Sequence, residues 1–384
     1  LPHIAVGRTV ADRGGAPARG DGAIYPIRDY RPAPDLFPPI AFVPYVSPAS
    51  DFSAGLTFLG GDPVGLHEWQ LELGWGLESR QPEAAVTYGY RNWEVFPSLS
   101  AATAEQRVRT DPDVFRRVTT AGLGLTYPWA TLRTSQAASL GYQATFFHAP
   151  HPPGDGTTEL AGVATELRAG WSLASFDRPA ESVSPEAGAS LRLVGRLGSP
   201  HLGGDFDYRI LTAHGGAYLR MPWARHHVLA LLANAGTSGG SMGARGAFAL
   251  GGPPLGDSLV DLILRAGVLG ETLLRGYVPG AFAGSEFFLG SAEYRFPIVW
   301  LDRAPGWLPI YLGKLAGVLF ADAGNAFDRW PPDALHPSVG AELQLGFHVG
   351  WGAYGGALRL GTAWGFDRDQ GGGLQLYLGL GGSF

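Results

Sequence analysis

Apolar and polar residues alternate along the last segment of the chain. From Leu374 to Leu380 every second residue is leucine, and Gln, Tyr or Gly stands between the leucines. Successive side chains of a β-strand point to opposite faces, so this period of two predicts a strand with one apolar face and one polar or small face. Such a strand suits a wall between lipid and a wet interior.

The same alternation recurs through much of the chain. One stretch places Trp69, Leu71, Leu73, Trp75 and Leu77 on one face and Glu68, Gln70, Glu72, Gly74 and Glu78 on the other. Similar stretches surround Leu167, Leu193, Leu343 and Leu360. Charged residues keep to one face of each stretch, as expected where the other face contacts lipid.

The alternation predicts sixteen strands, at residues 39–47, 52–62, 66–80, 83–92, 94–108, 112–128, 131–149, 158–177, 186–199, 206–222, 226–238, 285–298, 314–327, 337–349, 352–366 and 374–384. Many reach the roughly 9–11 residues that a tilted strand needs to cross a bilayer, whereas soluble strands most often have about 5–6. We therefore expect an all-β fold, a 16-stranded antiparallel transmembrane β-barrel. A soluble β-sandwich is the alternative, and it predicts solubility without detergent.

Proline and aromatic residues stand together where several predicted strands end. These groups are Tyr127-Pro128-Trp129, Met221-Pro222-Trp223, and Phe296-Pro297 with Trp300. Proline donates no ladder hydrogen bond, so we expect it to stop each strand and the neighbouring ring to lie at the headgroup level. With an even number of strands, the long connections 150–157, 200–205 and 239–284 all lie on the side opposite the chain ends. Two connections on the terminus side, 178–185 and 299–313, are longer than this rule predicts.

The first 36 residues show no periodicity. They are rich in Pro, Gly, Arg and Asp, which predicts a linker or an extension lying in the lumen, and the barrel is expected to occupy residues 37–384. Residues 1–20 lack the basic, apolar and small-residue regions of a signal peptide. We therefore expect the chain to be a mature protein or a piece of a longer one.

Composition excludes several classes of protein. The chain contains no apolar run long enough for a membrane-spanning helix. The net charge of −6 offers no clustered basic surface for nucleic acid. The absence of cysteine excludes disulfides and thiolate metal sites and fits an oxidising compartment.

Four motifs in residues 239–384 resemble a known family. They are Arg275-Gly276-Tyr277, the strand Glu293-Tyr294-Arg295-Phe296-Pro297, the strand from Phe320 to Phe327 (FADAGNAF), and the terminal Phe384. In this order they resemble the BamA/TamA family of outer-membrane assembly barrels, also called the bacterial surface antigen family. The resemblance covers essentially the whole barrel and implies a cell outer-membrane location in a Gram-negative organism.

The resemblance implies a long loop before strand 12 that folds back into the lumen, where Arg275 contacts Glu293 and Asp322. Strand parity agrees, because Glu293 lies opposite the face of Ala292 and Asp322 opposite the face of Ala321, so both acids point inward. Gly276 is expected to permit a sharp turn and Tyr277 to pack on the wall. The alternative for Arg275 is an ordinary solvated loop residue.

The resemblance also implies a role in inserting, assembling or translocating proteins at the outer membrane. The seam between the first and last strands would open and pair with a client strand. The residues expected at the seam and in the C-terminal signal are Tyr377, Gly379, Gly381, Gly382 and Phe384. The alternative is a passive barrel that anchors, or forms a plugged pore for, a periplasmic or surface partner domain.

Membrane lipid and lipopolysaccharide are the expected partners, joined in the assembly role by client outer-membrane proteins and by periplasmic or lipoprotein subunits. The family usually carries POTRA domains before the barrel, and a related branch carries a TolB-type propeller. Thirty-six residues are too few for either domain. The segment 30–39, with Asp62, Gly65 and His67 further on, looks more like the junction after a propeller.

Three other motifs do not support chemistry. Gly239-Gly240-Ser241-Met242-Gly243 matches a nucleophile elbow but lacks a placed histidine and acid, and Gly350-Trp351-Gly352-Ala353-Tyr354-Gly355 falls in a predicted hairpin rather than before a helix. His226 and His227 would face opposite sides of a strand and could not share one ion. We expect no enzyme activity, no metal and no organic cofactor.

Overall fold

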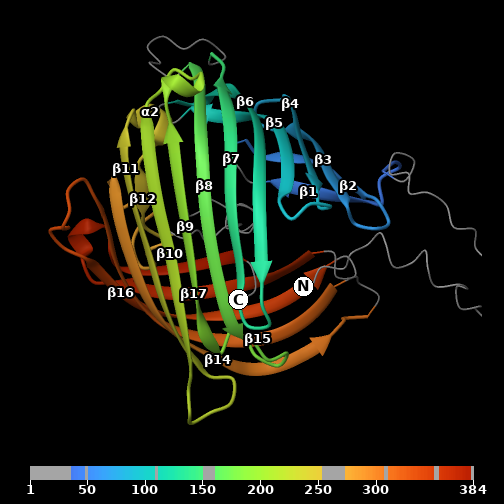
Figure 1. The fold of residues 1–384 in the computed structure, drawn as a ribbon. Coiled ribbons are helices and arrows are strands. Elements are labelled where there is room, and N and C mark those ends of the chain that lie inside the picture. Colours follow the sequence, from blue (N-terminus) through green and yellow to red (C-terminus); the bar gives the residue numbers. More distant parts are fainter. Residues whose placement is uncertain are drawn as a thin grey trace, which may run out of the picture.

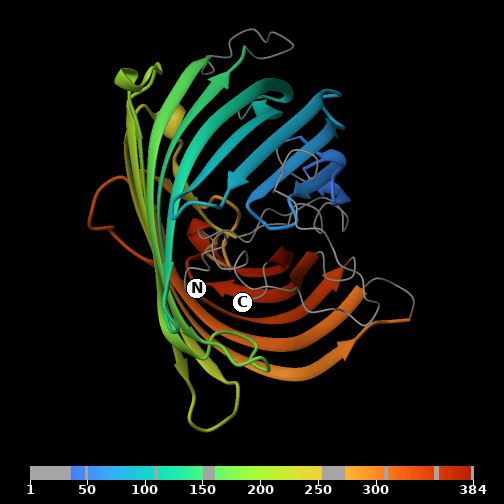
Figure 2. The ribbon, with the colours of Figure 1, turned by 45° about the vertical axis from the view of Figure 1, so that its right-hand side comes forward.

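The structure is a computed structural model that describes residues 36–47, 51–108, 111–149, 161–252, 273–306, 310–349 and 354–381. These residues form one sixteen-stranded antiparallel sheet that curls around an interior (Figures 1 and 2). The strands are β1 (Ala41–Ser47), β2 (Ser53–Gly61), β3 (His67–Gly76), β4 (Pro82–Tyr90), β5 (Phe96–Val108), β6 (Asp111–Ala130), β7 (Ser135–Phe147), β8 (Gly162–Asp177), β9 (Ala187–Gly198), β10 (Tyr208–Arg220), β11 (Val228–Gly240), β14 (Glu286–Arg303), β15 (Ile310–Phe327), β16 (His336–Val349), β17 (Tyr354–Gly365) and β18 (Leu374–Gly381). The prediction of sixteen antiparallel strands in an all-β fold is confirmed.

Every strand of this sheet pairs with the strand next to it in the chain, except where a long insertion separates β11 from β14. The described parts of that insertion contain a one-turn helix α2 (Met242–Arg245) and a second, two-stranded sheet of β12 (Phe248–Leu250) and β13 (Phe282–Gly284). Two short 3-10 helices, η1 (Pro200–Leu202) and η2 (Arg368–Gln370), lie in other connections. The insertion is thus not a simple loop but has its own local structure.

The register of the sheet sorts side chains into two faces. Paired residues share a face, so Leu231 lies beside Ala217 and Ala292, whereas Glu293 lies beside Ala230 and Phe320. Exposed apolar residues on the first face include Leu73, Leu123, Leu193, Leu231, Leu319, Leu343 and Leu376, and buried charged residues on the second face include Glu166, Glu293, Arg295, Asp322 and Glu342. The alternation therefore turns apolar side chains outward and charges inward.

Two of the three proline predictions are wrong. Pro128 lies inside β6 and is paired with Ala137, and Pro297 lies inside β14 and is paired with Ala316. A register shift follows Pro297, and a bulge of this kind is a place where a strand tolerates proline. Because β14 continues to residue 303 and β15 begins at 310, the expected connection 299–313 is also wrong, and the real one is shorter.

The division into an extension of residues 1–36 and a barrel of residues 37–384 stays a prediction, because residues 1–35 lie outside the described part of the chain. No helix among the described residues is long and apolar enough to cross a membrane.

Candidate functional site at the inner loop

The described parts of the insertion, residues 241–252 and 273–285, pack against the inner face of the sheet. Leu250, Leu274, Tyr277 and Phe282 of the insertion form a buried cluster with Phe287, Leu289 and Ala326 of β14 and β15. Phe287 and Leu289 share the inward face of Glu293, because all three are separated by even numbers of residues. The insertion is therefore an inner loop, as the family resemblance implies.

Arg275 of the inner loop meets two carboxylates of the wall. Its Nε donates to Asp322 Oδ2 at 2.7 Å and its Nη2 donates to Asp322 Oδ1 at 2.6 Å. The same Nη2 lies 2.9 Å from Glu293 Oε1. The guanidinium carbon also sits 3.5 Å from the centroid of the Phe320 ring. The bidentate contact with Asp322 uses the fork geometry that distinguishes arginine from lysine.

All three charged groups are shielded from water. Arg275 is 5% exposed, Glu293 4% and Asp322 3%. Removing one member of such a buried set leaves an uncompensated charge, which costs on the order of 3–5 kcal/mol. The contacts therefore tie the inner loop to β14 and β15 by charge as well as by apolar packing.

Gly276 brings the loop backbone against β17. Its φ is +91°, a conformation that other residues rarely adopt. A Cβ added there would lie 2.6 Å from the backbone nitrogen of Gly365. The carbonyl of Gly276 accepts a hydrogen bond from the backbone of Gly373 at 3.1 Å. Only glycine fits this close approach.

Tyr277 is fully buried and joins the inner loop to β16 and to the β17–β18 connection. Its hydroxyl donates to the backbone carbonyl of Pro337 at 2.8 Å and lies 3.4 Å from Asp367. His336 contacts the same Asp367 through Nδ1 at 2.8 Å, and its ring stacks on Phe282 with centroids 4.0 Å apart. Tyr277 thus contacts the start of β16 and the β17–β18 connection together.

A second charged group that the sequence analysis did not single out lies on the neighbouring strands. Glu342 of β16 faces Arg359 of β17 at 2.9 Å and accepts a hydrogen bond from the Tyr377 hydroxyl at 2.7 Å. Arg295 lies 2.7 Å from Glu293 and extends the first group along β14. Strand parity could have identified these residues from the sequence, because it places each of their side chains on the inward face of its strand.

Three of the residues expected at the seam, Tyr377, Gly379 and Gly381, lie on β18. Tyr377 is 2% exposed and points into the interior, beside Gly361. Gly379 is paired with Arg359, and Gly381 is paired with Ala357. Gly382 and Phe384 lie outside the described residues. The structure therefore brings together the five inner-loop residues, and it links Tyr377 to the interior charges.

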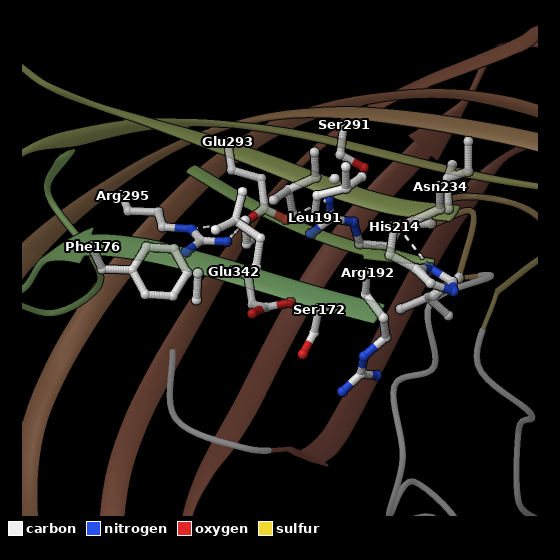
Figure 3. A pocket seen from close by; sticks show the side chains of 18 of the residues that line it. Ser172, Phe176, Leu191, Arg192, His214, Asn234, Ser291, Glu293, Arg295 and Glu342 are labelled. Carbon is white, nitrogen blue, oxygen red and sulfur yellow. Dashed lines mark hydrogen bonds and ion pairs between the residues drawn. The ribbon is translucent and has the colours of Figure 1, made fainter. Parts of the chain in front are cut away.

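A cavity of about 570 Å³ lies beside Arg275 in the interior. Figure 3 shows Glu293, Arg295 and Glu342 gathered at one side of it and Arg192, His214 and Asn234 at the other. His214 Nδ1 lies 3.2 Å from Asn234 Oδ1. Charged and polar side chains line much of the cavity beside a few leucines, which fits an aqueous interior.

The remaining sequence motifs have separate environments. His226 and His227 lie in the turn before β11, not on a strand as expected, and they bond different partners, Glu186 and Tyr294. Within the described ranges no group of three or more His, Asp or Glu residues is arranged to hold a metal ion. Residues 350–353 of the glycine-rich motif lie outside the described residues, between the paired strands β16 and β17.

Comparison with known proteins adds a family and a fold. Residues 62–384 match the Omp85 superfamily domain. A search of curated proteins gives no match. Among solved structures, BamA from Haemophilus ducreyi lacking POTRA domains 1–3 is 15% identical with a TM-score of 0.57, covering 88% of this chain and 68% of that one.

Two structures named CdiB are also similar in fold. CdiB from Escherichia coli is 14% identical with a TM-score of 0.56, and the match covers 89% of this chain and 62% of that one. CdiB from Acinetobacter baumannii is 10% identical with a TM-score of 0.52, and the match covers 89% of this chain and 59% of that one. The present chain thus spans about three-fifths of the length of each CdiB structure.

Proposed function

Because the chain belongs to the Omp85 superfamily and is an outer-membrane β-barrel of the BamA/TamA type, we propose that it inserts, assembles or translocates proteins at the outer membrane. The proposal concerns a mechanism without bond-making chemistry, so no residue is assigned a catalytic role. The inner-loop contacts and the two terminal strands of the sheet support it.

The observation that carries the proposal is the character of the two terminal strands. β1 and β18 end the described order of the sheet, and among the described residues each pairs with a neighbouring strand on one side only. A strand at the end of a sheet offers backbone donors and acceptors to another strand. We infer that a client strand pairs with this seam and leaves as its own barrel closes.

The inner loop has a complementary role in this proposal. Arg275, Gly276, Tyr277, Glu293 and Asp322, here called the lock, fix the loop inside the barrel. A fixed loop narrows the interior while the seam carries the client. The lock therefore separates movement of a client strand from leakage through the lumen.

Partners follow from the same proposal. The outward apolar face contacts membrane lipid, and the outer rim contacts lipopolysaccharide. Clients are unfolded outer-membrane proteins, and periplasmic or lipoprotein subunits deliver them. A relationship to the branch with a TolB-type propeller is a further part of the proposal. It rests on the resemblance at residues 30–39 with Asp62, Gly65 and His67.

A passive barrel is the second candidate function. It is favoured by the buried ion pairs of the lock, because a loop held this firmly suits a permanent plug as well as a regulated one. In that case the barrel would anchor a partner domain, and the seam would stay closed.

A seam cross-link separates the two functions. The chain has no native cysteine, so Phe42→Cys in β1 can be combined in turn with Leu374→Cys, Leu376→Cys or Leu378→Cys in β18. The assay follows the folding of an unfolded eight-stranded outer-membrane barrel into lipid vesicles that contain each variant. We expect the oxidised variant that cross-links to fold the probe at the rate of empty vesicles, and reduction to restore the faster rate.

The matched control joins two strands that are already paired. Phe42→Cys with Phe58→Cys links β1 to β2, where these positions face each other, and should not change the rate. Full activity with an oxidised seam would overturn the assembly role and favour the passive barrel.

A further inference from the structure

The connection between β8 and β9 lies at the end of the sheet where β1 begins and β18 ends, and it contacts β14 and β15 there. Strands alternate in direction, so β8, the eighth strand, ends on the same side as β18, the sixteenth. The connection, residues 178–186, crosses from β8 to the ends of β14 and β15 (Figure 2, green segment over orange strands). Its length is unusual for this side of the barrel, as the sequence analysis noted.

Two side chains hold the connection by its backbone. Lys314 of β15 donates from Nζ to the carbonyls of Ala180, at 2.5 Å, and Ser182, at 2.9 Å. Trp300 of β14 donates from Nε1 to the carbonyl of Glu181 at 3.1 Å. Three consecutive carbonyls are therefore bound across the mouth by strands that are four and five places away around the sheet.

The connection lies on the interior side of the wall. Val183 is 8% exposed and lines a cavity of about 220 Å³ together with Lys314, Ala316, Gln344 and Ala357. Ala316 and Gln344 are paired and share the inward face of Glu342, which is two residues from Gln344. The connection thus covers interior side chains rather than the lipid face.

The second end of the connection is held by charge. Glu186 contacts Arg220 at 2.6 Å and His226 at 2.7 Å. Burial alone would raise the pKa of Glu186, but hydrogen bonds with His226 and Ser182 and the charge of Arg220 outweigh it and lower that pKa. The carboxylate therefore stays ionised at neutral pH. His226 keeps a φ of +62°, an uncommon conformation for a residue with a side chain.

We propose that residues 178–186 form a strap that closes the terminus-side mouth of the lumen. Its residues 178–184 are released when their polar contacts with Trp300 and Lys314 break, while Glu186 stays bound to Arg220 and His226. Apart from Val183 and two prolines, the strap has few apolar side chains to bury. A segment held mainly by a few polar contacts can open without unfolding the barrel. The strap and the inner loop then act as two closures in series. This inference holds whether the barrel inserts clients or only anchors a partner.

Thiol labelling measures opening of the strap directly. Ser184 is fully buried, so in a Ser184→Cys variant a water-soluble maleimide should react slowly. Adding Trp300→Phe and Lys314→Met should raise the labelling rate by roughly tenfold or more, the change expected when a charge-assisted hydrogen bond is lost. Heat-modifiable gel migration verifies that each variant still forms a folded barrel.

The control substitutions lie at the same end of the barrel as the strap. Arg133→Ala removes an exposed charge from the neighbouring β6–β7 turn and should leave the labelling rate of the Ser184→Cys variant unchanged. Ser135→Cys, at an exposed position, should react fast in every background. Equal labelling of the thiol at position 184 with and without Trp300 and Lys314, in folded protein, would overturn the strap.

Ion conductance in planar lipid bilayers tests the series arrangement. With either closure intact the lumen should conduct little, so Arg275→Ala alone and Trp300→Phe with Lys314→Met alone should each give small increases. The three substitutions together should conduct more than the sum of those increases. A combined variant that conducts no more than Arg275→Ala alone would show that the strap closes nothing.

Discussion

At the scale of single residues, Arg275 joins both acidic residues of the lock. Its guanidinium reaches Asp322, Glu293 and the ring of Phe320, while the next residue in the chain is a glycine that no side chain could replace without a backbone clash. The turn at Gly276 directs Arg275 toward Asp322 of β15, and it directs Tyr277 toward β16 and the β17–β18 connection.

Replacement of Arg275 by Ala is expected to destabilise docking of the inner loop by about 3–5 kcal/mol, because two buried carboxylates lose their counter-charge. Limited proteolysis of folded protein in detergent should then cut residues 241–285 much faster than in the parent. Arg275→Lys keeps the charge but loses the two-pronged hydrogen bonding of the guanidinium, so its cleavage rate should fall between those of the parent and Arg275→Ala. Equal protease resistance of Arg275→Ala and the parent would contradict the lock.

At the scale of elements, each strand separates lipid from an aqueous interior because its successive side chains point to opposite faces. Leu231 and Leu232 of β11 show the contrast within two residues: Leu231 is 43% exposed on the outward face, whereas Leu232 pairs with Gly216 and Ser291 and lines the interior cavity. Two neighbouring leucines therefore have different surroundings: Leu231 faces lipid, and Leu232 faces the interior cavity.

Arginine introduced at these two positions should distinguish the solvents. Leu231→Arg places a charge in hydrocarbon and should lower the free energy of unfolding by up to about 2–4 kcal/mol, the cost for arginine near the bilayer midplane. Leu232→Arg enters a polar cavity beside Glu293 and should cost clearly less. Urea unfolding in lipid vesicles measures both, and an equal loss in the two variants would argue against the assigned faces.

At the scale of the whole molecule, the fold presents a broad apolar surface. Exposed large apolar residues occur on nearly every strand, from Phe42 on β1 to Leu376 on β18, with exposed fractions of 68% for each of these two. Monomeric soluble proteins rarely expose contiguous apolar surface on this scale. The surface therefore needs lipid or detergent.

The purified chain should accordingly require detergent, and in detergent it should migrate differently on a gel before and after boiling, since a sheet of sixteen paired strands resists unfolding at room temperature. The measurement is semi-native electrophoresis across a temperature series. A monomer that stays soluble in plain buffer would contradict the membrane barrel and support the soluble sandwich.

The local pattern was sufficient for much of this fold. Alternation with a period of two depends only on neighbouring residues, so it located the sixteen strands and set the inward direction of Glu293 and Asp322 before any contact was known. Local rules failed where sheet geometry intervenes. Pro128 lies beyond the last pair between β5 and β6 and is paired on the β7 side only, and Pro297 lies at a register shift, so both strands tolerate proline.

Contacts across the sheet depended on the tertiary structure. The sequence determined which face each side chain occupies, because parity is a property of one strand. Only the register and curvature of the whole sheet decided which inward groups meet, such as Glu342 with Arg359 and Tyr377, and brought residues 178–186 to Trp300 and Lys314, more than a hundred residues away. Periodicity carries no information on these distances, since they are set by how sixteen strands stagger and curl around a common interior.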